Sequence, residues 1–463
     1  MRKKLLSVAL CVAMAATALV GCGSKDEKDD TKKKDDGGSS ADKEAGGDET
    51  AGSVYFLNFK PEIADDYETL MAAFTEETGI EAKVVTAAEG QYESTLKVEM
   101  EKEEAPTLFT VNGPVGYNTW KDYCADLTDT ELYKLLNQKD MAISTDDGVF
   151  GIPLMQETYG LICNKAIFEK YFALDGIADT GCKSIEDINS FEKLKAVSDD
   201  MQAHKADLGI EGVFSEIALN SGSNWRITNH LYCLPLYYEY TTKGISDAAE
   251  IEFTHADQYK AIIDLYLTDS TVPQSDASSG SVDDSMLEFA QGKAAIAQNG
   301  VWAWNQINPE KVDGSVVKAE DLYYMPIYIG AEGEEEQGLC TGTENFVCIN
   351  SQASDDDIAA SEKFLEWLYT SETGTAFVST SYGVAPFDGF NNSDAEEANP
   401  LVKLALADDK TPVTWVTTTT PSEAWKNALG ENLLAYAEGS TEWSTVVSEA
   451  IDKWASEKAA ANE

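Results

Sequence analysis

The stretch SVYFLNFKPEIADDYETLMAAFTEETGIEAKVV, residues 53–85, decides the fold class. Its first seven residues are rich in β-branched and aromatic side chains and predict a strand. Apolar side chains then recur at the spacing of one helix face, and Gly79 marks the helix end. Residues 80–85 alternate between apolar and polar side chains and predict a second strand. The apolar helix positions are Tyr67, Leu70, Met71 and Phe74.

The next segment repeats this pattern. A charged amphipathic helix is predicted over residues 92–104, Pro106 ends it, and TLFTV (107–111) is a short apolar strand. The order β-α-β-α-β is typical of an α/β domain with a largely parallel sheet. Ligands in such domains bind in the loops beyond the strand ends, which here include Asn58-Phe59-Lys60 and Asn112-Gly113.

The remaining body mixes strands and helices. We predict two short strands within 150–164, separated by or including 155–158, and a long, mostly helical middle region. A strand over 294–298 leads into an Asn299-Gly300 turn. The acidic loop around Glu334 is expected to be solvated. Further predictions are strands over 323–329 and 344–350, a helix over 359–369, and two or three helices after Pro421.

The N-terminus carries an export signal. A basic tip, MRKK, precedes a short apolar run that ends in LVGC, residues 19–22. Small residues before a cysteine resemble the bacterial lipobox, so we expect a signal peptide over 1–21 and a lipid on Cys22. An ordinary signal peptide cleaved elsewhere is the alternative. Residues 22–52 lack aromatic side chains and predict a disordered tether.

Charge and length narrow the possible functions. A body of about 410 residues predicts two domains. The formal charge of −48 becomes about −51 when Arg2, Lys3 and Lys4 leave with the signal. So acidic a surface argues against nucleic acid or anionic lipid as a partner. Six cysteines could be free thiols or form at most one bridge: Cys124, Cys163, Cys182, Cys233, Cys340 and Cys348.

Motifs for catalysis and metal binding are absent. The sequence has no GxSxG, HExxH, P-loop or GxGxxG motif and no CxxC pair, and only three histidines. We therefore expect no enzyme activity, no metal and no cofactor. A secreted glycoside hydrolase stays an alternative, because it needs only two carboxylates across one cleft.

Tryptophans in loop-like positions are the remaining signal. Sugars present apolar faces and rings of hydroxyls, which flat aromatic rings and planar polar groups recognise. Trp225 stands between Asn224 and Arg226, and Trp302 follows Asn299-Gly300. Such rings can equally belong to the core.

Three segments resemble a known family. QGKAAIAQNGVWAWNQI (291–307) resembles the segment of maltose- and maltodextrin-binding proteins in which Asn-Gly precedes two tryptophans. GIPLMQETYGLICNKAIF (151–168) resembles their strand followed by a glutamate. Residues 344–374, with YGVAP (382–386), resemble the later part of family 1 extracellular solute-binding proteins. The resemblance covers residues 53 to about 455.

The resemblance implies a fold and a role. It implies an α/β, periplasmic-binding-protein-like fold of two discontinuous lobes, with hinges near Glu157 and 344–347 and a ligand cleft between the lobes. Lobe one would comprise 53–155 plus 345–395, and lobe two 160–340 plus 396–463. It also implies a monomer on the extracellular face of the bacterial cytoplasmic membrane. There it would deliver an oligosaccharide, first of all a maltodextrin-type α-glucan, to the permease of an ABC transporter.

The resemblance also suggests binding residues. Trp302 matches a sugar-stacking tryptophan, Trp304 a structural one, Glu157 a hinge glutamate that bonds sugar hydroxyls, and Trp425 a stacking tryptophan on a late helix.

Two further positions match less closely. Asn224 and Trp225 fall where the family places ligand-facing aromatic residues. Asn112 and Gly113 replace an Asp-Arg pair of maltose binders. This departure leaves open another oligosaccharide, a sugar alcohol or a small peptide as the cargo. Asn58, in the loop after the first strand, completes the set of predicted binding residues.

Overall fold

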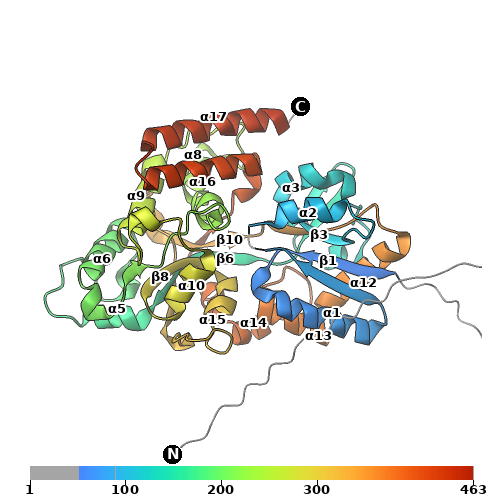
Figure 1. Ribbon diagram of the computed structural model, residues 1–463, viewed down its shortest axis with the longest axis horizontal. Coiled ribbons are helices and arrows are strands. Elements are labelled where there is room, and N and C mark those ends of the chain that lie inside the picture. Colours follow the sequence, from blue (N-terminus) through green and yellow to red (C-terminus); the bar gives the residue numbers. More distant parts are fainter. Residues whose placement is uncertain (1–51, 89, 462–463) are drawn as a thin grey trace, which may run out of the picture. The chain divides into compact units, whose positions relative to one another are not determined.

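The computed structural model describes residues 52–88 and 90–461 and contains two β-sheets (Figure 1). The first sheet has the strand order β2-β1-β3-β11-β5-β4. Strands β1, β2 and β3 run parallel, whereas β11 lies antiparallel to both β3 and β5. The strands are β1 (Ser53–Asn58), β2 (Glu81–Thr86), β3 (Leu108–Asn112), β4 (Ile143–Thr145), β5 (Gly148–Pro153) and β11 (Asn345–Ile349).

The second sheet has the order β12-β10-β6-β8-β7, and β9 pairs with the C-terminal half of β6. Its central strand β6 lies antiparallel to β8 and β10. The strands are β6 (Glu157–Asn164), β7 (Gly212–Phe214), β8 (Ala294–Gly300), β9 (Leu322–Met325), β10 (Gln337–Gly342) and β12 (Thr411–Thr414).

Helices cover each sheet and define two lobes, named here by their sheets. The first lobe contains α1 (Ala64–Thr78), α2 (Tyr92–Met100), α3 (Gly113–Trp120), α4 (Glu131–Leu135), α12 (Asp355–Thr370) and α13 (Glu372–Phe377). The second contains α5 (Lys165–Phe172), α6 (Phe191–Ala203), α7 (Lys205–Leu208), α8 (Cys233–Lys243), α9 (Ala256–Thr268), α10 (Val282–Ala290), α11 (Trp304–Ile307), α14 (Asn392–Ala398), α15 (Pro400–Leu406), α16 (Glu423–Ala437) and α17 (Trp443–Ala461).

The chain passes between the two sheets at closely spaced points. Strand β5 ends at Pro153 and β6 begins at Glu157, while β10 ends at Gly342 and β11 begins at Asn345. These two crossings are short segments of two or three residues, as hinge closure requires, and residues 378–391 form a longer third crossing between α13 and α14. The predicted two-lobed α/β fold is confirmed, whereas the predicted residue limits of each lobe stay a prediction.

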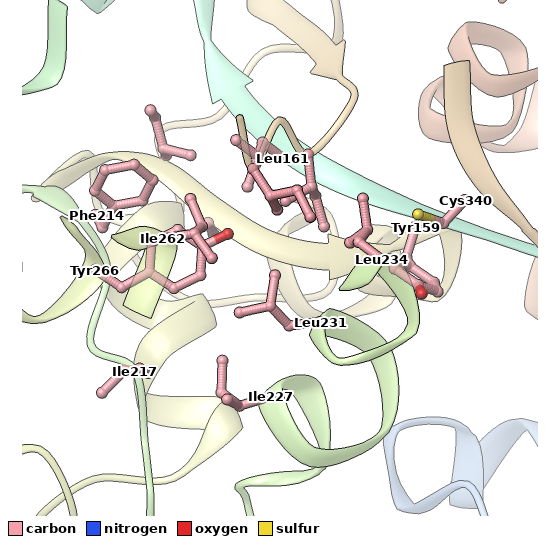
Figure 2. Close-up of a cluster of buried hydrophobic side chains, with 14 of the residues drawn as sticks. Tyr159, Leu161, Phe214, Ile217, Ile227, Leu231, Leu234, Ile262, Tyr266 and Cys340 are labelled. Atoms are coloured by element: carbon pink, nitrogen blue, oxygen red, sulfur yellow. The ribbon is translucent and has the colours of Figure 1, made fainter. Parts of the chain in front are cut away.

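Each lobe has its own apolar core. The larger core belongs to the second lobe, where Tyr159 and Leu161 of β6 pack with Leu231, Ile262 and other side chains from the surrounding helices (Figure 2). The first lobe buries the predicted helix face of α1 against β1, α12 and α13. Separate cores allow the lobes to move as units about the short crossings.

Most predicted elements are confirmed, one expectation was wrong and another holds only in part. Helix α1 ends at Gly79, whose φ of +75° is the left-handed geometry that glycine favours. Asn299 and Gly300 do not form a turn, because both belong to strand β8; the chain turns at a 3₁₀ segment, η7 (Val301–Ala303). In the acidic loop, Glu335 and Glu336 are exposed as expected, but Glu334 is buried and accepts backbone hydrogen bonds from Phe191, Ile329 and Gly330.

The six cysteines of the body are free thiols, five of them buried and Cys182 partly so. Within residues 52–88 and 90–461, no helix is long and apolar enough to cross a membrane. The predicted signal peptide, lipid-bearing Cys22 and tether lie outside the described residues.

Candidate functional site

A cavity of about 360 Å³ lies between the two lobes. The first lobe contributes residues from the loop after β1, from the start of α2 and from the end of β3. The second lobe contributes the start of β6, the segment before α8, the start of α10, Trp302 and Gln306 after β8, and the first turns of α16. Pockets of this size and mixed lining bind small organic ligands.

Lys60 projects into the cavity from the loop that follows β1. Asn58 shapes this loop, because its side-chain amide donates to the Lys60 carbonyl (2.8 Å) and its side-chain oxygen accepts from the Lys60 N–H (2.9 Å). The predicted binding residue Asn58 is fully buried and supports the loop instead of lining the cavity. Lys60 was not among the predicted binding residues.

The Lys60 ammonium forms a buried ion pair across the lobes. Its Nζ lies 2.8 Å from Oε1 of Glu157 and 3.7 Å from Oε1 of Glu62. Burial alone would lower the pKa of Lys60, but the charges of Glu157 and Glu62 outweigh it and raise the pKa. Glu157, predicted to bind sugar hydroxyls, thus lines the cavity with one oxygen already engaged.

Trp302 lines the cavity but is only 8 % exposed. One side of its ring lies close to the backbone of Gly300, where an added Cβ would approach ring carbons to about 2.0 Å. Lys60 Nζ lies over the ring, 5.3 Å from its centroid. Trp304 does not line the cavity and packs, partly buried, against the second core. Glycine at position 300 is therefore what lets the Trp302 ring reach the cavity.

Asn224 and Trp225 both line the cavity, and the Trp225 ring centroid lies 6.2 Å from that of Trp302. Their neighbour Arg226 is buried and points the other way. It donates to Ser285, to the Gln298 carbonyl and to backbone carbonyls of residues 216 and 217. Arg226 thereby fixes the loop that carries Trp225 to strand β8.

A wide helical turn brings His230 to the cavity. Residues Arg226–Leu231 form a π-helical segment, η5, a geometry often found at functional sites. The His230 ring stacks on Tyr159, with centroids 4.4 Å apart, and its Nε2 lies 3.8 Å from Oε1 of Glu344. Glu344 also accepts a hydrogen bond from Asn229. Burial raises the pKa of Glu344, but His230, Lys426 and Asn229 outweigh it and hold the pKa below its usual value.

The first turns of α16 line the cavity with polar groups. Ser422 caps the helix by accepting from the Trp425 N–H, 3.0 Å away. Glu423, Lys426 and Asn427 then share one helix face at i, i+3 and i+4 and line the cavity. Trp425 lies on another face and is 1 % exposed.

The position of Trp425 corrects its predicted role as a stacking platform. Its indole N–H donates to the Ala450 carbonyl (2.8 Å), and its ring meets that of Trp454 edge to face. No ring face is left for a ligand in this arrangement. The predicted helix is at the cavity, but a different face of it is used.

Asn112 and Gly113, at the end of β3, have different surroundings. Asn112 lines the cavity. Gly113, with a φ of +59°, instead donates its N–H to the Glu344 carbonyl (2.9 Å) and lies against Thr418 of the second lobe. Gly113 thus belongs to the contact between the lobes next to the hinge.

Several cavity residues were not predicted from the sequence: Lys60, Glu62, Tyr92, Glu93, His230, Glu344, Glu423 and Lys426. The i, i+3, i+4 spacing of polar residues after the Pro421-Ser422 cap was a usable signal for the last two. Lys60 follows the first strand, where ligand loops are expected. His230 carried no local signal, because only the π-helical turn turns it toward the cavity.

Comparison with known proteins identifies the family. Residues 69–404 match the family described as bacterial extracellular solute-binding protein. Comparison with curated proteins returns no match.

Solved structures agree in fold. One described as a chitin oligosaccharide binding protein is 17 % identical, covers 88 % of this chain and 99 % of its own, and has a TM-score of 0.67. T. maritima MalE3 bound to maltose is 16 % identical, with 87 % and 99 % coverage and a TM-score of 0.63. The GacH receptor of Streptomyces glaucescens, solved unliganded and with acarbose, is 16 % identical, with 88 % and 99 % coverage and a TM-score of 0.64.

Proposed function

The chain belongs to the bacterial extracellular solute-binding proteins, and from that premise we propose that it is a receptor for a short oligosaccharide. The cavity between the lobes is the observation that carries this proposal. It combines two indole rings, Trp225 and Trp302, with amide and carboxylate groups from both lobes. Aromatic faces suit the apolar faces of pyranose rings, and planar polar groups suit their hydroxyls.

The size of the cavity favours a short ligand. About 360 Å³ lies near the lower end of the range for small-molecule pockets. We therefore propose a ligand of a few sugar units. The resemblance of residues 291–307 to maltodextrin-binding proteins makes an α-glucan fragment the first sugar to test.

Capture would proceed by closure of the lobes. Segments 154–156 and 343–344 connect the sheets, and Glu157 and Glu344 lie at these two crossings and also line the cavity. A ligand held by both glutamates would bias the hinge, because it would contact each lobe and each crossing at once. The closed receptor would then deliver the sugar to the permease of an ABC transporter.

The receptor would be held at the membrane by a lipid on Cys22. The proposal rests on the LVGC motif and the polar segment that follows it. A Cys22→Ser variant expressed in a bacterial host should leave the membrane fraction for the soluble one, whereas the wild type should stay with membranes. Equal fractionation of both proteins would contradict the anchor.

Calorimetric titration of the body, residues 53–463, with a panel of di- and trisaccharides tests the central proposal. We expect at least one saccharide to bind saturably, to quench tryptophan fluorescence, and to be recovered uncleaved after prolonged incubation. Tight binding of peptides or sugar alcohols, with no response to any saccharide, would overturn it. Release of shorter sugars would instead indicate a glycoside hydrolase.

A further inference from the structure

The charges that line the cavity are unbalanced. Among the described residues, six carboxylates line it against two ammonium groups. The carboxylates are Glu62, Glu93, Glu157, Asp283, Glu344 and Glu423, and the ammonium groups are Lys60 and Lys426. An enclosed site with one excess sign of charge attracts the opposite charge more strongly than the same groups do in open water.

Both lysines are already committed to carboxylates. Lys60 Nζ lies 2.8 Å from Glu157 and 3.7 Å from Glu62. Lys426 Nζ lies 2.5 Å from Oε1 of Glu423. The remaining carboxylates accept hydrogen bonds from neutral groups: Asp283 from Gln306, Glu93 from Trp120, and Glu344 from Asn229. These neutral donors add no positive charge, and of the two lysines of the cavity Lys426 acts on both Glu93 and Glu344.

Two of these carboxylates line the cavity from opposite lobes. Glu93 stands in the first turn of α2 in the first lobe, and Glu423 in the first turn of α16 in the second. Burial raises the pKa of Glu93; the Glu423 charge raises it further, while the Trp120 hydrogen bond and Lys426 act against the rise. Closure thus brings like charges together unless a cation lies between them.

His230 gives an independent sign of a missing polar partner. Its side chain is 2 % exposed and lines the cavity, and neither ring nitrogen has a hydrogen-bond partner among the described residues. Its nearest carboxylate oxygen, on Glu344, is 3.8 Å away, beyond hydrogen-bond distance. Buried polar groups normally find partners, so a polar ligand group is expected beside this pair.

The cavity also shows how it holds an ammonium group. The Lys60 nitrogen lies against Glu157 and over the rings of Phe59 and Trp302, 5.2 and 5.3 Å from their centroids. Carboxylate and aromatic face together are a favourable environment for a cation. Within the described residues, no group of three or more His, Cys, Asp or Glu side chains converges as metal ligands do, which favours an organic cation.

We propose that the saccharide captured by this cavity carries at least one ammonium group, as an amino sugar does. The inference rests on the proposed receptor function and narrows it. The ammonium would lie near Glu93, Glu344 and Glu423, where only Lys426 supplies positive charge, and the sugar ring would lie toward Trp225 and Trp302. An amide or hydroxyl in its place would leave these carboxylates uncompensated.

Matched ligands test the charge directly. The body is titrated at pH 7 with the di- and trisaccharides of glucosamine, with the same compounds N-acetylated, and with maltose and maltotriose. We expect the free amines to bind about tenfold tighter than the N-acetylated forms, because charge-assisted hydrogen bonds exceed neutral ones. Their advantage should shrink as salt is added. Equal or tighter binding of the N-acetylated or neutral sugars overturns the inference.

A variant separates charge from shape. Glu93→Gln keeps an acceptor for the Trp120 indole and removes one negative charge. It should weaken free-amine binding about tenfold more than N-acetylated binding, whereas Glu131→Gln, an exposed change outside the cavity, should change neither. An equal loss for both ligands would assign Glu93 a structural role and overturn the charge argument.

The failures of the two proposals are distinguishable. Tight binding of neutral oligosaccharides, with no preference for amines, would leave the receptor function standing and refute the ammonium. Binding of spermidine, with no saccharide bound, would refute the saccharide receptor itself.

Discussion

The two walls of the cavity are built differently. The second-lobe wall presents the rings Trp225, His230 and Trp302, which pack on one another and on the large core behind them. The first-lobe wall presents charged and polar groups after the ends of β1 and β3 and at the start of α2, and Lys60 pairs with Glu157 across the cavity. The aromatic wall therefore owes its shape to the core, whereas Lys60 of the charged wall has its nearest partner, Glu157, across the cleft.

Removing a ring behind the aromatic wall should have the largest effect. Trp425→Ala would empty a fully buried site and lose the indole hydrogen bond to Ala450, at a cost of about 3–5 kcal/mol in the free energy of unfolding. Urea unfolding followed by circular dichroism measures this loss. A stable variant with weakened ligand binding would instead return Trp425 to the role of platform.

Removing Lys60, the cation of the charged wall, should have the second-largest effect on stability. Lys60→Met leaves the buried Glu157 and the partly buried Glu62 without their ammonium, which should cost about 3 kcal/mol in unfolding free energy at pH 7. The double variant Lys60→Met/Glu157→Gln should recover part of this loss, because one orphaned charge is gone. If the double variant is as unstable as the sum of both single variants, the pair does not couple the lobes.

A buried carboxyl behind the aromatic wall should make stability depend on pH. The pKa of Glu216 is raised to about 7, mainly by burial and then by the nearby charges of Glu288 and Asp284, while Arg226 opposes the rise. Because the folded pKa exceeds the unfolded one, the stabilising effect of the protonated form is complete below about pH 4.5 and is lost as the pH rises through 7.

The test compares Glu216→Gln with the wild type by urea unfolding at pH 4.5 and pH 8. From pH 4.5 to pH 8, the free energy of unfolding of Glu216→Gln should rise by about 2 kcal/mol relative to that of the wild type. This is less than the full pKa shift implies, because solvent screens part of it. Glu131→Gln, an exposed change, should show no such gain. Parallel pH profiles for wild type and Glu216→Gln would contradict the raised pKa.

Alanine substitutions of Trp302 and Trp304 should differ in their effects on ligand affinity and on stability. Trp302→Ala removes a ring that lines the cavity and should weaken ligand binding about tenfold, since an aromatic contact contributes about 1 kcal/mol or more. Trp304→Ala should lower stability and leave affinity unchanged. Because Trp302 is itself 8 % exposed, its removal should also lower the melting temperature. Unchanged affinity in Trp302→Ala would show that the ring is not a platform.

Local patterns predicted the elements better than the site. The face of α1 and its end at Gly79 follow from spacing alone, since period and left-handed geometry are local properties. Trp425 and Lys426 are neighbours on one helix, and only the packing of α16 on α17 decides which of them is buried. The Lys60–Glu157 pair spans 97 positions, so it exists only once the lobes have met. Residue type is visible in the sequence, but orientation across a cleft is a property of the tertiary fold.

A second lysine–carboxylate ion pair between the lobes tests whether burial determines how much such a pair contributes to stability. Lys311 of the second lobe lies 3.0 Å from Asp66 of the first, which is close to Lys60 in the sequence, but both side chains are about 40 % exposed. Lys311→Ala should therefore cost less than about 0.5 kcal/mol in unfolding free energy, and high salt should abolish the difference. A cost as large as that of Lys60→Met would mean that contact between the lobes, and not desolvation, gives both pairs their strength.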